Sequence, residues 1–125
     1  MDAKETRAFA KRLMDEVWRP FDYTKLGDFY MQDVIGHHRT QTIHLQDIEN
    51  RLRRDRLHWT DPVYDIPNLI VQPDAFALRF IFSATRIDTG KRDTTEGIYF
   101  YYLKDGKISE FWHLASVDFD YFEKQ

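Results

Sequence analysis

The sequence predicts an α+β domain in which three helices cover a strongly curved, mostly antiparallel sheet. Apolar residues recur every three or four positions in the first half of the chain, and they alternate with other residues after Pro62. This period changes once and does not change back, which separates the helices from most of the strands along the chain. A chain of 125 residues is expected to fold as one domain over residues 1–125.

Three amphipathic segments predict the helices. The first covers residues 2–19 and ends before Pro20, the second covers residues 23–31, and the third covers residues 45–59. The third segment also carries charged pairs four positions apart, such as Arg51 with Asp55, which we expect on a solvated helix face.

Five segments predict the strands. A short one, residues 34–38, lies between the second and third helices, and the others cover residues 63–72, 75–87, 95–103 and 106–118. Pro67 cannot donate a backbone hydrogen bond, so the strand that contains it is expected at a sheet edge or at a bulge.

Composition excludes several classes of protein. With 18 basic and 21 acidic residues, the formal net charge is −3, which leaves no basic surface for nucleic acid or anionic lipid. The chain has no cysteine, which excludes disulfides and thiolate nucleophiles and is compatible with the cytoplasm, the location that we expect. The charged N-terminal segment lacks the apolar stretch of a signal peptide, so neither processing nor a membrane partner is expected.

No cofactor or metal ion is predicted. The five histidines show no ligand spacing, and the chain contains no glycine-rich phosphate loop. Aromatic residues make up 16% of the chain, which suits either a core built from large rings or a cavity lined by them. A small hydrophobic molecule would be the ligand of such a cavity.

The last strand follows the Asp105-Gly106 turn and alternates strictly. One face carries Ile108, Glu110, Trp112, Leu114 and Ser116, and the other carries Ser109, Phe111, His113, Ala115 and Val117. Both faces contain large apolar side chains, so the strand fits either the wall of a pocket or the centre of a packed sheet.

The order of these elements resembles the SnoaL-like (polyketide cyclase-like) branch of the nuclear-transport-factor-2-like superfamily. The resemblance covers the whole chain and is most specific in the run Asp105-Gly106-Lys107-Ile108-x-Glu110-x-Trp112 and in the strand that ends in His37-His38. It implies a cone that encloses a mostly apolar cavity, with the tryptophan face of the last strand on its inner wall. The ligand contacts expected from it are Trp112, Leu114, Ser116, Trp59 and Tyr102.

The catalytic signatures of that branch are not intact. An aspartate stands four residues after the tryptophan in polyketide cyclases of this family, where this chain has Ser116. The related limonene-epoxide hydrolases carry an aspartate two residues after it, where this chain has Leu114. A serine without an activating partner is too weak a base for proton abstraction.

Glu110 and His38 are the predicted catalytic residues. A carboxylate beside an indole loses solvation, which raises its pKa toward the useful range, and a histidine titrates near neutral pH. Only one of His37 and His38 can face inward, because neighbours on a strand point in opposite directions. A surface glutamate, a structural histidine and a structural His113, placed at a subunit contact, are the alternative interpretations.

Two functions remain open. The first is a cofactor-independent enzyme, an isomerase, cyclase or hydratase-like lyase, that moves a proton on a hydrophobic carbonyl or polyketide-like ligand. The second is a non-catalytic module that binds a ligand or a partner chain. A homodimer is expected in either case, because Tyr99 and Tyr101 oppose Phe100 and Tyr102 and helices can cover only one face of the sheet.

Overall fold

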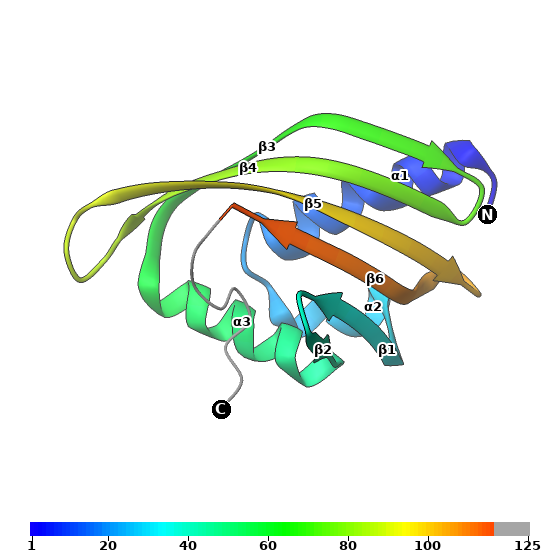
Figure 1. Cartoon of the computed structure of the whole chain (residues 1–125), viewed down its shortest axis with the longest axis horizontal. Helices are drawn as coiled ribbons and strands as arrows, with labels where there is room; N and C mark the ends of the chain where they lie inside the picture. Colours follow the sequence, from blue (N-terminus) through cyan, green and yellow to red (C-terminus); the bar gives the residue numbers. More distant parts are fainter. Residues whose placement is uncertain (117–125) are drawn as a thin grey trace.

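The computed structural model describes residues 1–116, which form three helices and one six-stranded sheet (Figure 1). The strands are β1 (Tyr30–His38), β2 (Gln41–Ile43), β3 (Trp59–Gln72), β4 (Ala75–Arg86), β5 (Arg92–Lys104) and β6 (Lys107–Ala115). They lie in the order β2-β1-β6-β5-β4-β3, so β2 and β3 are the free edges and the sheet does not close. The predicted α+β class is confirmed.

One parallel pair makes the sheet mixed. β1 runs parallel to β6, with Gly36 opposite Phe111 and His38 opposite His113, whereas the remaining neighbours are antiparallel. This pairing joins the two halves of the chain, because the paired residues His38 and His113 are 75 positions apart in the sequence.

The helices are α1 (Ala3–Leu13), α2 (Leu26–Phe29) and α3 (Leu45–His58). α1 continues into a π-helical turn (Met14–Trp18), in which the Arg19 backbone N–H donates to the Met14 carbonyl at 2.9 Å. A single 3₁₀ turn (Tyr23–Lys25) precedes α2. The second helix is therefore shorter than predicted, because β1 already begins at Tyr30.

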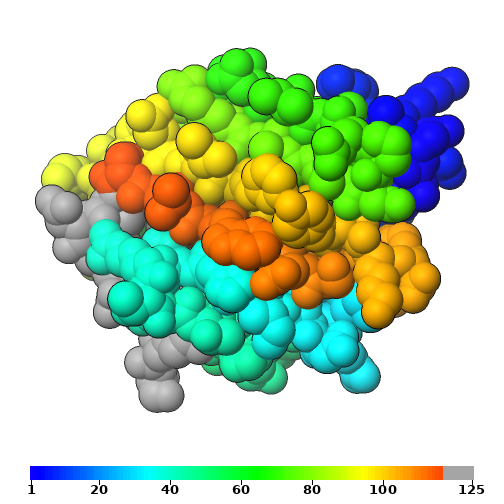
Figure 2. Space-filling model, turned by 45° about the vertical axis from the view of Figure 1, so that its right-hand side comes forward, coloured from blue at the N-terminus to red at the C-terminus, as the bar shows by residue number. Residues whose placement is uncertain are grey.

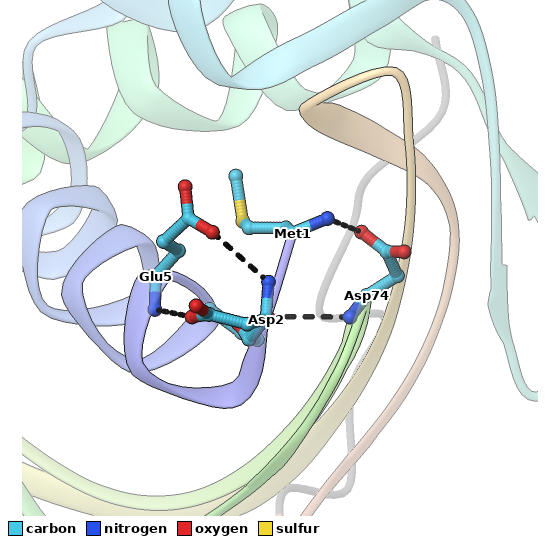
Figure 3. A network of polar contacts seen from close by, with 5 residues as sticks. Met1, Asp2, Glu5 and Asp74 are labelled. Atoms are coloured by element: carbon cyan, nitrogen blue, oxygen red, sulfur yellow. Dashed lines mark hydrogen bonds and ion pairs between the residues drawn. The ribbon is translucent and has the colours of Figure 1, made fainter.

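The start of α1 is closed by a capping box (Figure 3). The Glu5 backbone N–H donates to the Asp2 carboxylate at 2.8 Å, and the Asp2 backbone N–H donates to Glu5 Oε1 at 3.1 Å. The Met1 amine forms an ion pair with Asp74 at 3.1 Å, and this carboxylate raises the pKa of the amine. These contacts join the first turn of α1 to the turn between β3 and β4.

β3 is an edge strand with two irregularities, as Pro67 predicted. Its register against β4 shifts between Thr60 and Val63 and again between Asp65 and Asn68, the step that contains Pro67. The strand β2 was not predicted from the sequence, because three residues are too few to show a period.

The helices cover one face of the sheet, and the core lies between them. Phe9 of α1 packs edge to face on Phe76 of β4 with ring centroids 6.1 Å apart, and Trp18 contacts Tyr99 of β5 at 6.1 Å. Burial alternates along β4 and β5, so that Phe76, Leu78, Phe80, Phe82, Tyr99 and Tyr101 face the helices. We call this the inner face of the sheet and the opposite one the outer face.

Candidate functional site

His37 and His38 are neighbours on β1 and point to opposite faces of the sheet. His38 lies on the inner face with 1% of its surface exposed, whereas His37 lies on the outer face and is partly exposed. Gly36 and Val34, two and four residues before His38, are buried on the same side. His38 is thus the histidine of this pair that the sheet directs into the protein.

The parallel pairing of β1 with β6 places His38 against His113. Their Nδ1 atoms are 2.8 Å apart, and His38 Nδ1 also lies 3.2 Å from the His113 carbonyl oxygen. A carbonyl can only accept, so a proton on His38 Nδ1 satisfies both contacts at once. We therefore assign His113 as the neutral tautomer with its proton on Nε2, which leaves the basic lone pair of His38 on its own Nε2.

His113 is held in an aromatic environment. Its ring stacks on Phe80 at 5.9 Å and lies 4.4 Å from the ring of Tyr99, and only 1% of the residue is exposed. Burial lowers the pKa of His113 well below its usual value, and the neighbouring His38 and Arg51 lower it further. The imidazole is therefore neutral at physiological pH.

A buried ion pair on α3 lies near the two histidines. Arg51 Nε donates to both carboxylate oxygens of Asp55, at 3.1 and 2.9 Å, and both side chains are buried. Asp55 balances the charge of Arg51, which makes this cation tolerable in the interior. The expectation that these two residues lie on a solvated helix face is wrong, because this side of α3 packs toward the sheet.

Tyrosines supply the remaining polar groups on the inner face. Trp18 Nε1 donates to the Tyr30 hydroxyl at 3.3 Å, and Tyr99 and Tyr101 stack at 5.1 Å. Burial raises the pKa of Tyr30 to about 12, against the smaller opposing effect of its hydrogen bonds with Trp18 and Tyr101. Its phenol therefore keeps its proton at any physiological pH and can act as a hydrogen-bond donor.

This inner polar cluster combines three kinds of chemistry in one apolar setting. It contains the mutually oriented imidazoles of His38 and His113, of which His113 is neutral, the protonated phenol of Tyr30 with the rings of Tyr99 and Tyr101, and the guanidinium of Arg51, whose charge Asp55 balances. Such groups can move a proton and stabilise a developing oxyanion without a metal ion.

Most of the predicted ligand contacts lie on the outer face instead. Trp112 is 40% exposed and Leu114 is 66% exposed, and Tyr102 and Ser116 are exposed on the same side. The expectation that the tryptophan face of the last strand lines the interior is wrong in this structure. Phe111 and His113, which point the other way, face the helices.

Glu110 also lies on the outer face, where it meets His37 and not His38. His37 Nε2 is 2.7 Å from Glu110 Oε2, and the imidazole stacks on the indole of Trp112 at 4.8 Å with an interplanar angle of 20°. The predicted convergence of Glu110 and His38 on one ligand therefore does not occur in this structure.

Ser116 and Trp59 lie apart from the inner polar cluster. The Ser116 hydroxyl accepts from the Glu96 backbone N–H at 3.2 Å, an arrangement that extends the pairing of β5 with β6. Trp59 packs edge to face on Phe82 at 5.8 Å, under the guanidinium of Arg86. Ligand binding by either residue stays a prediction.

A family model for the SnoaL-like polyketide cyclases matches residues 8–117 of the sequence. The chain belongs to this family. The match confirms the resemblance found in the sequence.

Solved structures of this fold resemble the chain closely in three dimensions. AclR from Streptomyces galilaeus superimposes with a TM-score of 0.81 at 18% identity, covering 90% of this chain and 79% of its own. A SnoaL-like polyketide cyclase from Agrobacterium tumefaciens gives 0.66 at 20% identity, covering 90% and 88%. A nuclear-transport-factor-2-like protein from Burkholderia pseudomallei gives 0.70 at 14% identity, covering 94% and 92%. No curated protein matches the sequence.

Sequence reasoning missed most of the inner polar cluster. The sequence favours a structural role for His113, at a subunit contact, and predicts of Tyr99 and Tyr101 only that they oppose Phe100 and Tyr102 on their strand. A usable signal was present, because His113 and Phe111 are two residues apart and so share one face of the strand, and two rings on β5 lie on the same side. Its partner on β1 could not be found, since parallel pairing leaves no short-range mark in the sequence.

Metal binding and membrane insertion receive no support from residues 1–116. No group of three or more histidine, aspartate or glutamate side chains in this part of the chain could hold a metal ion. None of its helices combines the length and apolar character needed to cross a bilayer.

Proposed function

We propose that this protein acts on a small hydrophobic carbonyl compound by cofactor-independent proton transfer, as an isomerase or cyclase, with His38 as the base. The observation that supports this most is the buried pair of imidazoles, whose Nδ1 atoms are 2.8 Å apart. Each ring of this pair orients the other. With the proton of His38 on Nδ1, the basic lone pair of His38 is on Nε2.

His113 would assist as a positioning residue. When His38 Nε2 takes a proton from carbon, the imidazolium that forms keeps donating through Nδ1 to the His113 carbonyl and to His113 Nδ1. The lowered pKa of His113 favours its remaining the neutral acceptor while His38 carries the charge. Without this acceptor, the charged ring would lose both its orientation and part of its stabilisation.

The phenols would serve the carbonyl oxygen of the substrate. A phenol whose pKa is raised, as for Tyr30, keeps its proton and can donate to the oxygen on which negative charge develops. The stacked rings of Tyr99 and Tyr101, with Phe80 beside His113, provide an aromatic wall suited to a planar ligand. Because both imidazoles are 1% exposed, we expect ligand binding to require movement of the side chains around them.

The reaction can be tested before the natural substrate is known. Aromatic ketones and poly-β-ketone compounds are first screened for binding by thermal shift. Each binder is then incubated with the protein in D₂O, and exchange of the protons next to its carbonyl is followed by NMR. The His38→Gln variant is expected to lose roughly a hundredfold or more of the exchange rate, the usual contribution of a positioned base.

Two matched variants complete the test. His37→Gln changes the adjacent histidine on the opposite face and should keep the exchange rate, as should Glu110→Gln, which removes the outer carboxylate. Full exchange in His38→Gln would remove this residue from the mechanism. Loss of exchange in Glu110→Gln would restore the carboxylate as the base.

The outer face supports a second candidate, a homodimeric interaction module. Five large side chains of β5 and β6 are exposed together there, namely Ile98, Phe100, Tyr102, Trp112 and Leu114. These strands, coloured yellow to red, form a band across the face shown in Figure 2, between β3 and β4 in green and β1 and β2 in cyan. An apolar surface of this kind is unusual on a monomer, so we propose that a second copy of the chain covers it.

A further inference from the structure

A groove of about 490 Å³ lies between α1 and the edge of the sheet formed by β3 and β4. Figure 1 shows α1 running along these two strands. The volume of the groove falls in the range of small-molecule binding sites. The residues that line this groove are different from those of the inner polar cluster, which are His38, His113, Arg51, Asp55, Tyr30, Tyr99 and Tyr101.

The groove is held open by the geometry of β3. The strand shifts its register between Asp65 and Asn68, so Ile66 and Pro67 leave the regular ladder where they pass α1. Helix and strands are tied together on both sides of this opening. The Asp74 backbone N–H donates to Thr6 Oγ1 at 3.2 Å, and Arg19 Nη2 donates to the Tyr64 carbonyl at 2.9 Å.

The floor of the groove is apolar. Ala10 of α1 and Met14 of the following π-helical turn line it on one side, and Leu69 of β3 and Leu78 of β4 line it on the other. Three of these four residues are buried, and Leu69 is partly buried. A hydrocarbon chain or ring placed here would lose contact with water along its length, so each buried methylene would strengthen binding.

The rim of the groove is cationic. Arg7, Lys11 and Arg19 line it together with one carboxylate, Asp15, which pairs with Arg19. Within residues 1–116, neither Arg7 nor Lys11 forms an ion pair. These two cations are four residues apart on the exposed side of α1, so they repel each other in the unliganded protein. An anion between them would relieve this repulsion.

We propose that this groove binds an amphipathic monoanion, an apolar chain or ring that carries one carboxylate. The carboxylate lies between Arg7 and Lys11, and the apolar part lies on Ala10, Met14, Leu69 and Leu78. This site is separate from the inner polar cluster, so it supplies a second ligand-binding position whatever reaction the cluster performs.

Decanoate is a suitable probe, with decanol as the neutral control and acetate as the control without a chain. Titration of the full chain, followed by backbone NMR, should show decanoate binding with shift changes in α1 and around Ile66 to Leu69. Affinity should rise from butyrate to decanoate and fall with added salt, because both the chain and the charge contribute. Decanol should bind more weakly than decanoate.

Charge-removing variants test the rim. Lys11→Gln should weaken decanoate binding by roughly threefold, and the double change of Arg7→Gln with Lys11→Gln by roughly tenfold, the size expected for solvent-accessible ion pairs. Lys4→Gln removes an exposed lysine of the same helix that does not line the groove, and it should leave binding unchanged. Thermal melting of each variant establishes that it is folded.

Three results would overturn the proposal. The first is no binding of decanoate at millimolar concentration, the second is equal binding to the double variant, and the third is shift changes on His38 and His113. The last result would place the ligand in the inner polar cluster, and so it would separate the two sites directly.

Discussion

The ring of Phe111 lies directly over Gly36. A Cβ atom built on this glycine would come within 2.1 Å of the ring, much closer than two carbon atoms can approach. The two residues are paired across β1 and β6, Gly36 two residues before His38 and Phe111 two residues before His113. The missing side chain of Gly36 therefore allows the parallel strand pair that creates the inner polar cluster.

Replacing Gly36 with alanine is expected to destabilise the protein by about 1–3 kcal/mol, the usual cost of adding a methyl group to a filled core. Urea denaturation would measure the change. Gly27→Ala is the control, because a Cβ at this exposed helical position meets nothing within 4 Å. Equal stability of the Gly36 variant and the wild type would show that β1 and β6 do not pack as described.

Stability should fall as the pH drops below about 6.5, the ordinary pKa of histidine. Burial, His38 and Arg51 lower the pKa of His113 in the folded chain, so the unfolded chain binds a proton that the folded chain does not. The free energy of unfolding then decreases with falling pH by up to about 1.4 kcal/mol per unit until the folded pKa is reached. His38, Arg51 and the ring of Tyr99 lie around this imidazole, and Asp55 balances the charge of Arg51.

Denaturation at several pH values between roughly 6.5 and 5 would measure this slope. His113→Gln should flatten it, whereas His58→Gln should keep it, because that change at an exposed helix end leaves the buried pair intact. An unchanged slope in the His113 variant would assign the acid sensitivity to other groups.

Alkaline pH should destabilise the protein through Tyr30. Its pKa is raised to about 12 in the folded chain, so the unfolded chain loses the phenolic proton first, near pH 10. The stabilisation is complete below about pH 10 and is lost as the pH rises toward the folded value. Tyr30→Phe should remove this loss, and Tyr102→Phe, a change at an exposed ring, should not. An identical alkaline transition in the wild type and in Tyr30→Phe would show that Tyr30 does not cause the loss of stability.

A charge on the outer face should separate the proposed homodimer. Leu114→Glu would place a carboxylate in the middle of the apolar contact of the proposed homodimer. We expect it to weaken the association of the two copies by roughly a hundredfold or more. Leu57→Glu is the matched control, since this leucine is equally exposed but lies on α3. Light scattering would distinguish the 15.1 kDa chain from a dimer. A monomeric wild type would remove the dimer from consideration.

Local chemistry in the sequence was sufficient for most of the fold. Pro20 and the stripe before it predicted α1, the alternation through Phe76, Leu78, Phe80 and Phe82 predicted β4, and Pro67 predicted the irregular edge strand β3. Each of these patterns extends over only a few residues, so it can be recognised without knowing how the rest of the chain folds.

The last strand, β6, shows what local sequence patterns cannot predict. Its alternation determined that Glu110, Trp112, Leu114 and Ser116 share one side and that Phe111 and His113 share the other. Its prediction that Ile108 lies on the side of Trp112 is wrong, because the register of β6 against β5 shifts between Ile108 and Glu110 and Ile108 is buried in the core. It could not determine which side meets the helices, because both carry large apolar groups. Only the tertiary structure decided this, through the packing of α1 and α3 on the side that continues the phenylalanines of β4.

The pairing of the histidines also required the complete fold. The sequence by itself determined that one of His37 and His38 points inward and that β6 carries a histidine opposite Trp112. Only the parallel docking of β1 on β6, made possible at Gly36, decided that His38 meets His113 while His37 meets Glu110. The reason is physical: alternation is a property of a single strand, whereas register between strands 75 residues apart depends on how their side chains pack.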